Sequence, residues 1–276
     1  MCDNNSDDQT YEHAFNKYGL HDNIEIYKNN QNLGRVGNWN KLLDIASSRP
    51  EKFLKFVFDG EEIFPNCIEE CSKVIGNYPD LAAIVFNYEF INANGGVKVS
   101  PAVKDTEGFL NNNKVLSLNH VQGGFLGSIV ANVYSKKAIG DIRFNEHYVS
   151  KTDFDFEVLN NKSAYYLNKT LARTYVTRRN TYFKTLDFWF ESENVFLQTK
   201  WLEKQKEFLP KEDYLRAREI IYLTFFERNR NNFSTGIQIK LFKRISMNIL
   251  QLVLIIIIKK IIPNKLLIKL KKLMRY

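Results

Sequence analysis

Two carboxylates that follow an apolar run are the first residues of this sequence suited to do chemistry. Asp59 and Glu61 come directly after FLKFVF (53–58). We expect them at the carboxyl end of a buried strand, where ligands bind in open α/β sheets. Two carboxylates two residues apart in a loop can share a hard divalent cation such as Mg²⁺ or Mn²⁺, which would neutralise a diphosphate. The alternative is a solvated acidic turn that binds nothing.

A second acidic pair lies in TDFDFEVLNN (152–161), which we expect to form a short helix. Asp153 and Asp155 stand at its start, where the helix dipole favours acids, so spacing alone favours a helix cap. The functional alternative is a general base. A carboxylate at a loop–helix junction that faces a cleft can deprotonate an attacking hydroxyl.

The segments that must position these acids alternate between strand-like and helix-like patterns. Apolar runs predict strands at 23–27, 53–58 and 81–90. Apolar residues at helical spacing predict helices at 36–46 and 65–76. This alternation indicates an α/β fold with a parallel sheet.

The second half of the sequence is less regular. We expect a turn at 92–96, a helix that begins near Ser128, and two strands around an Asn-Lys turn within 164–176. Between 186 and about 230, aromatic and charged residues recur at helical spacing, which predicts a helical extension.

Composition places the chain among ordinary globular proteins. Its 276 residues are 44% hydrophobic and 25% charged, enough to bury a core and to argue against disorder. The three cysteines (Cys2, Cys67 and Cys71) cannot form a framework of paired disulfides, and the last two stand four apart on one expected helix. We therefore expect buried thiols in a reducing compartment.

The net charge of +8 is concentrated at one end of the sequence. Residues 240–276 hold ten Lys or Arg and no acidic residue, which leaves 29 basic against 31 acidic side chains in 1–239. The body of the protein is therefore nearly neutral, which argues against a general nucleic-acid binder.

The basic tail has the pattern of a membrane-surface segment. ILQLVLIIII (249–258) is apolar but too short to cross a bilayer, which takes about 20 residues. NKLLIKLKKLM (264–274) is amphipathic and cationic, which suits the interface of an anionic membrane. We expect the tail to hold the protein at the membrane; the alternative is a helix packed on the rest of the chain.

Four motifs occur in an order that resembles a known enzyme family. DNNSDD (3–8) is followed by NQNLGRVGNWNKLL (30–43), by the strand, acidic loop, proline and helix of 53–75, and by TDFDFEVL (152–159). Over residues 3–176 this succession resembles the inverting glycosyltransferases of family 2. The resemblance implies the A-type nucleotide-sugar-binding fold, a Rossmann-like α/β fold with a mixed, mainly parallel sheet flanked by helices.

The resemblance implies that two loops bind the nucleotide-sugar donor. Asp3 would contact the base or ribose, and Gly34 would allow a close backbone approach, with ordinary turn geometry as the alternative for this glycine. The residues that it assigns to the donor are Asp3, Asn5, Ser6, Gly34, Arg35 and Asn38.

The resemblance also implies the reaction chemistry. Asp59 and Glu61 would hold Mg²⁺ or Mn²⁺ on the donor diphosphate, and Asp153 would activate the acceptor hydroxyl for in-line attack at the anomeric carbon. Two departures concern the metal. The acidic loop is D-G-E where the family has a D-x-D type, and ARTYV (172–176) lacks the His that often follows the family's arginine.

Members of this family begin with a strand, a helix and a second strand before the D-N-x-S turn, which here lies at residues 3–6. We therefore expect an N-terminally truncated domain, through a start assigned too late or through decay of the copy.

Together these patterns predict three parts: a glycosyltransferase-like domain at 1–185, a helical extension at 186–239 and a basic amphipathic tail at 240–276. We expect transfer of a sugar to a lipid-linked or polysaccharide acceptor, with inversion, in cell-surface glycan synthesis at the cytoplasmic face of the membrane. The alternatives are an inactive glycosyltransferase-like remnant, a membrane-surface adaptor, and a nucleic-acid binder that uses the tail.

Overall fold

The computed structural model describes residues 1–100, 107–111, 119, 125–146, 150–175 and 182–229, and within 182–229 it describes the side chains of 193–222. The predicted basic tail at 240–276 lies outside these residues. No helix in the described part of the chain is long and apolar enough to cross a membrane.

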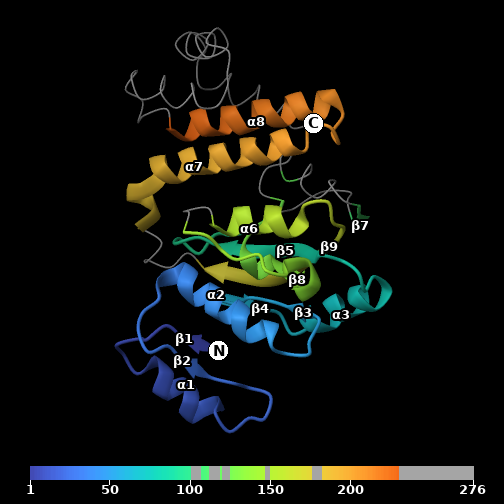
Figure 1. The fold of residues 1–276 in the computed structure, drawn as a ribbon. Coiled ribbons are helices and arrows are strands. Elements are labelled where there is room, and N and C mark those ends of the chain that lie inside the picture. The colour runs from blue at the N-terminus through green and yellow to red at the C-terminus, as the bar shows by residue number, and fades with distance from the viewer. Residues whose placement is uncertain (101–106, 112–118, 120–124, 147–149, 176–181, 230–276) are drawn as a thin grey trace.

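The described elements stack in three parts (Figure 1). A two-stranded parallel sheet of β1 (Cys2–Asp3) and β2 (Tyr27–Lys28) lies with α1 (Thr10–Tyr18) at one end of the molecule. A larger sheet with its helices lies in the middle. The paired helices α7 (Tyr182–Lys204) and α8 (Lys211–Asn229) lie at the other end.

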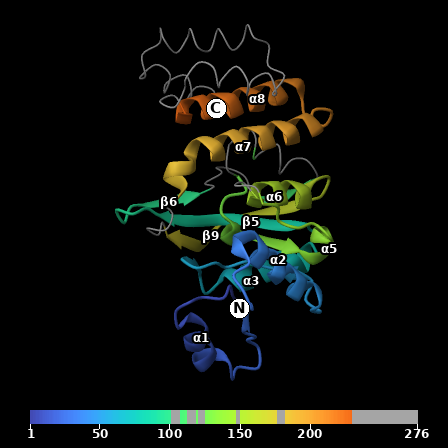
Figure 2. The ribbon, with the colours of Figure 1, turned by 60° about the vertical axis from the view of Figure 1, so that its left-hand side comes forward.

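The larger sheet holds seven strands, and five of them form its main path. Their order is β3 (Phe53–Leu54), β8 (Asn132–Ser135), β5 (Ala83–Ile91), β9 (Ala164–Tyr175) and β4 (Glu61–Ile63). Off this path, β6 (Val97–Ser100) pairs with β5, and β7 (Gly108–Leu110) pairs with β9. Figure 2 shows β5 and β9 running through the middle of the molecule.

The expectation of a mainly parallel sheet is wrong for the described strands. Only β1–β2 and β5–β9 pair in parallel there; the other described pairs are antiparallel. β8 lies between β3 and β5 and runs opposite to both, and β4, β6 and β7 are also antiparallel to their described partners. The sequence of β8, NVYS, is not an apolar run, so the strand pattern did not reveal it.

The core fills both faces of β5. Ala83 and Val85 pack with α2 (Gly34–Ser47), α6 (Ser150–Leu159) and α7. Ile84 and Phe86 pack on the opposite face with α3 (Cys67–Asn77). The thiols of Cys67 and Cys71 are buried there, as the sequence predicted.

The predicted helices at 36–46, 65–76 and 152–161 are confirmed as α2, α3 and α6, and the strand at 81–90 is confirmed as β5. The turn at 92–96 joins β5 to β6, where the amide of Asn92 donates to the Gly96 carbonyl at 2.9 Å. The strand expected at 23–27 is realised as the two-residue β2.

The apolar run at 53–58 is a strand only over its first two residues. Phe56 and Phe58 lie beyond the strand, with ring centroids 5.8 Å apart, and Phe58 stacks on Trp39 of α2 at 4.8 Å. Beyond Leu54 the segment is therefore held by aromatic packing and not by hydrogen bonds to a neighbouring strand. Asp59 follows the stacked Phe58 ring and not, as the sequence predicts, the end of a strand.

Two further expectations are wrong. The segment from Ser128 begins with a single 3₁₀ turn, η1 (Ile129–Ala131), and continues as the buried strand β8 before the one-turn helix α5 (Lys136–Ile139). The Asn-Lys pair at 168–169 forms no turn between strands. It lies within the continuous strand β9, where the register against β5 shifts beside Asn87.

Candidate active site

Asp3 closes the first loop of the candidate site. This buried carboxylate ends β1, and its two oxygens accept hydrogen bonds from Ser6, one from the hydroxyl at 2.6 Å and one from the backbone amide at 3.0 Å. Asn5 lies between them at φ 60°, a left-handed conformation that asparagine tolerates. The D-N-N-S motif is therefore a closed turn, and each Asp3 oxygen keeps a further lone pair for a ligand.

Asparagine amides join this turn to the start of α2. Asn4 donates to the Gly34 carbonyl at 3.1 Å. Asn29 donates to the Asn4 side chain at 3.1 Å and to the Asn38 side chain at 2.9 Å. The structure thus brings Asn38 and Gly34, which were predicted, next to the Asp3 turn. It adds Asn4, which stands in the DNNSDD motif but was assigned no role, and Asn29, which lies one residue before the second motif.

Arg35 lies at the beginning of α2, with its guanidinium carbon 5.0 Å from the centroid of the Trp39 ring. Burial lowers the pKa of Arg35, and the nearby carboxylates of Glu146 and Glu193 oppose that shift. Gly34 enters the helix at φ 71°, a conformation that favours glycine. Since Trp39 also stacks on Phe58, the Arg35 cation and the acidic loop share one aromatic support.

The two carboxylates do not share a loop as expected, because Glu61 is the first residue of β4, paired with Thr174 of β9, and Asp59 lies in the turn before it. Asp59 is exposed, and the chain turns at Gly60 with φ 76°. Glu61 is half-buried and accepts hydrogen bonds from the Phe58 amide at 2.9 Å and the Ser128 hydroxyl at 3.0 Å. Burial raises the pKa of Glu61, against those hydrogen bonds and nearby lysines. Glu61 therefore already holds the fold together, whereas Asp59 faces solvent.

The described residues contain no group of three or more His, Cys, Asp or Glu side chains placed to hold a metal ion. Two carboxylates are still compatible with Mg²⁺, which proteins commonly hold through one or two carboxylates while water and substrate phosphates supply the other ligands. The donor set of Asp59 and Glu61 thus fits a cation that arrives with a diphosphate, and does not resemble an all-protein cage.

Asp153 is buried in the first turn of α6, and side chains from two other segments hold its carboxylate. The indole Nε1–H of Trp201, from α7, donates to Oδ1 at 2.9 Å. The amide of Asn145 donates to Oδ2 at 2.5 Å. Both bonds come from side chains outside the helix, so Asp153 does more than cap α6. Asn145 and Trp201 have no signal in the sequence, because neither belongs to a motif.

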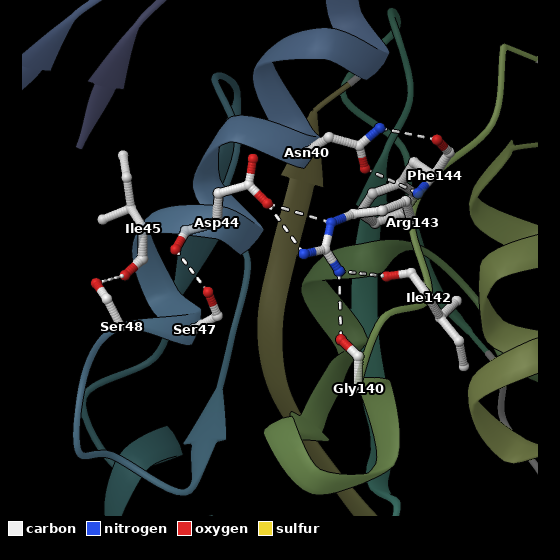
Figure 3. Close-up of polar contacts among 9 residues, drawn as sticks. All are labelled: Asn40, Asp44, Ile45, Ser47, Ser48, Gly140, Ile142, Arg143 and Phe144. Carbon is white, nitrogen blue, oxygen red and sulfur yellow. Dashed lines mark hydrogen bonds and ion pairs between the residues drawn. The ribbon is translucent and has the colours of Figure 1, made fainter.

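Asn40 of α2 fixes the segment that carries Asn145 (Figure 3). Its side-chain amide donates to the Phe144 carbonyl and its oxygen accepts from the Phe144 amide, both at 2.8 Å. One turn further along α2, Asp44 pairs with Arg143 at 3.0 Å. These bonds tie α2, which begins in the predicted nucleotide loop, to the residue that holds Asp153.

Asp155 is an internal ion-pair partner and not a second free acid. Its carboxylate lies 2.5 Å from the Lys151 ammonium and accepts from the Tyr134 hydroxyl at 2.6 Å. Burial raises the pKa of Asp155 and lowers the pKa of Lys151, while their attraction opposes both shifts. Of the two acids in the motif, Asp153 is therefore the one whose charge is not matched by a lysine in the described contacts.

Two partly buried lysines hold the segment 126–130. Lys151 donates to the carbonyls of Leu126 at 2.8 Å and Gly127 at 2.9 Å. Lys55 donates to the Val130 carbonyl, and its ammonium lies 4.6 Å from the centroid of the Phe86 ring. Burial lowers the pKa of Lys55 to about 8. A lysine inside the apolar run FLKFVF was the signal in the sequence for this buried cation.

The structure thus links most of the predicted residues through contacts. An aromatic cluster connects the Arg35 loop to α6: Trp39 meets Phe144 at 5.0 Å, and Phe144 stacks on Phe154 at 4.0 Å. Within the described residues no hydrogen bond or ion pair joins Asp59 to Asp153. Their segments are connected through this cluster and through 126–128, which contacts Glu61 on one side and Lys151 of α6 on the other.

Of the comparisons with known proteins, only the one with solved structures finds a similar fold. No protein-family model and no curated protein matches the sequence. The structure is similar to the crystal structure of S. aureus TarS 1-349, a glycosyltransferase, with a TM-score of 0.57 and 16% identity over 84% of this chain and 63% of that chain. A second S. aureus TarS structure gives a TM-score of 0.54 and 15% identity over 83% and 37%.

At this identity the similarity shows the fold alone, a mixed α/β architecture like that of TarS. The chain spans less than two thirds of the length of either TarS chain.

Proposed function

We propose that this chain is a glycosyltransferase that moves a sugar from a nucleotide-sugar donor to a lipid-linked or polysaccharide acceptor, with inversion. Support comes from its fold, which is similar to that of the glycosyltransferase TarS. The order of its motifs, which resembles family 2, gives independent support.

The observation that carries the proposal is the setting of Asp153. Its carboxylate is buried and is held by two uncharged donors, Trp201 and Asn145. Each of its oxygens keeps a further lone pair, and neither donor places a charge beside it. A carboxylate so fixed is suited to act as a general base toward a hydroxyl.

On the donor side, the closed Asp3 turn and the start of α2 would receive the nucleotide. Asp3 would accept a hydrogen bond from the base or the ribose, since its oxygens are held but not saturated. Arg35 would pair with phosphate oxygens, for which a guanidinium is well shaped. Asn5, Ser6 and Asn38 would shape these loops, as Asn38 does through Asn29.

The acidic loop would receive the diphosphate. Asp59, which is exposed, and Glu61 would hold Mg²⁺ or Mn²⁺ there. The cation would neutralise the charge that develops on the leaving nucleoside diphosphate.

The acceptor would then be activated by Asp153. The carboxylate takes the proton of the acceptor hydroxyl as its oxygen attacks the anomeric carbon, opposite the bond to the diphosphate. That bond breaks with its electron pair on the diphosphate, so one displacement inverts the anomeric centre. A tail that places the chain at an anionic membrane would supply lipid-linked acceptors, which is why we place the enzyme at the cytoplasmic membrane face.

The test is sugar transfer from a panel of nucleotide sugars with Mg²⁺ or Mn²⁺ to lipid-linked and polysaccharide acceptors. Asp153→Asn should lower turnover by at least about a hundredfold, as expected for loss of a general base. The matched control is Asp80→Asn, because Asp80 is exposed and lies 3.7 Å from an equally exposed Lys137.

Each outcome distinguishes the alternatives. Near-normal turnover of Asp153→Asn would reject the base assignment and leave Asp153 a structural residue. Donor binding without transfer for the unmodified chain would indicate an inactive glycosyltransferase-like remnant, and absence of both would leave the adaptor hypothesis.

A further inference from the structure

The helix α7 contributes a side chain to the base of the candidate site. Trp201 is only 1% exposed, and its single polar group is directed to the Asp153 carboxylate at 2.9 Å. A buried indole N–H normally finds a hydrogen-bond partner, but nothing in packing alone requires that partner to be a carboxylate.

The Trp201 ring is held from two sides, which fixes the direction of its N–H. Phe156 of α6 meets it edge-on, with ring centroids 5.6 Å apart and planes at 67°. The Lys204 ammonium lies 4.2 Å from the Trp201 ring centroid, within cation–π range. These contacts set the orientation of the indole, and with it the direction of its N–H.

The groups that donate to Asp153 are uncharged, whereas Asp155 is bound by a charged lysine. Asp155 is neutralised by Lys151, at 2.5 Å. Asp153 receives one N–H from Trp201 and one from Asn145, and neither donor carries a charge. Such a pair orients a carboxylate without placing a cation beside it, whereas an ion pair with lysine makes a carboxylate a weaker base.

The same helix also reaches the donor side. Glu193 precedes Trp201 by eight residues, which is about 12 Å along a helix. Its carboxylate is near enough to Arg35 to oppose the lowering of the pKa of that guanidinium. The contact of α7 with the candidate site that a distance establishes is therefore that of Trp201 with Asp153.

We infer that Trp201 of α7 is a positioning residue for the Asp153 carboxylate. The inference rests on the proposed function, because the positioning matters only if Asp153 accepts a proton. It assigns to the helical extension a part in catalysis that the sequence patterns did not suggest.

The kinetic test is Trp201→Phe, which keeps an aromatic ring and removes the N–H. We expect kcat to fall by about tenfold, the effect of losing one hydrogen bond, while the KM for the nucleotide sugar stays within about twofold because the donor loop is untouched. The matched control is Tyr214→Phe on α8, which removes one hydrogen bond, to Glu203, from another buried aromatic residue of the same helix pair. Its kcat should match that of the unmodified chain.

A spectroscopic test does not depend on activity. The chain has three tryptophans, and in ¹⁵N-labelled protein the indole signal of Trp201 is identified by its absence from the Trp201→Phe spectrum. A carboxylate acceptor should place this signal downfield, and Asp153→Asn should move it upfield by more than it moves the signal of Trp39.

The outcomes separate the two proposals. Unchanged kcat in Trp201→Phe, with an active unmodified chain, overturns the positioning role and leaves the proposed function intact. If Asp153→Asn does not change the chemical shift of the Trp201 indole, the positioning role is overturned as well. An unmodified chain that transfers no sugar overturns the proposed function, and the role of Trp201 falls with it.

Discussion

The pKa of Lys55 depends on how far its ammonium is removed from water. Its ammonium lies under the Phe86 ring and donates to Val130, and the groups that favour its charge are Cys67, Cys71 and Glu61. Burial outweighs them and lowers the pKa from 10.5 to about 8. Between these two pH values the unfolded chain binds a proton that the folded chain has released, so the free energy of unfolding contributed by Lys55 rises with pH.

We predict that the unfolding free energy of the unmodified chain, relative to Lys55→Met, rises by about 2 kcal/mol between about pH 7 and pH 10, since one pKa unit corresponds to about 1.4 kcal/mol. Urea denaturation of both proteins at each pH measures this difference, and the comparison cancels the other titrating groups. A difference that stays constant with pH would mean that Lys55 is solvated.

Helices were predicted better than strand directions, and the reason lies in the interactions that set each. α2, α3 and α6 follow from local apolar spacing. The bulge in β9 depends instead on a side chain far away in the sequence. Asn87 donates to Asn168 at 2.9 Å and accepts from the buried Tyr166 hydroxyl at 2.6 Å. No local pattern distinguishes such a bulge from the Asn-Lys turn that we expected.

The bulge can be tested by a double-mutant cycle. Asn87→Val should lower the free energy of unfolding by about 1–3 kcal/mol, because it removes the acceptor that lies 2.6 Å from the buried Tyr166 hydroxyl. Tyr166→Phe should cost less in the Asn87→Val chain than in the unmodified chain, because its hydrogen bond to Asn87 is already lost there. Purely additive effects in chemical denaturation would contradict the contact.

The candidate site was predictable only in part for the same reason. Asp153, Asp59 and Asp3 stand in motifs whose order carries a resemblance. The residues that position them act across long separations: Trp201 is 48 residues from Asp153, and Asn40 is 104 residues from Phe144. A sequence motif can reveal which residues do the chemistry of a site. The side chains that orient those residues are brought to them by tertiary packing, which the motif does not show.

At the scale of the whole molecule, the body (1–239) and the tail (240–276) differ in net charge. The body carries 29 basic and 31 acidic side chains, whereas the ten basic residues of 240–276 have no acidic residue among them. Each lysine near an anionic surface contributes about 1 kcal/mol of attraction, which salt screens. Membrane attachment should therefore depend on where the charges lie and not on the net charge alone.

We predict that replacing six tail lysines by Gln in the full chain weakens its retention on vesicles containing anionic lipid by at least about a hundredfold. The tail set is Lys259, Lys260, Lys265, Lys269, Lys271 and Lys272. The control removes the same charge from exposed lysines of the body: Lys17, Lys52, Lys98, Lys137, Lys206 and Lys211. Vesicle sedimentation at rising salt measures retention of both variants. The control should bind like the unmodified chain, and equal losses in the two variants would show that net charge, and not the tail, governs membrane binding.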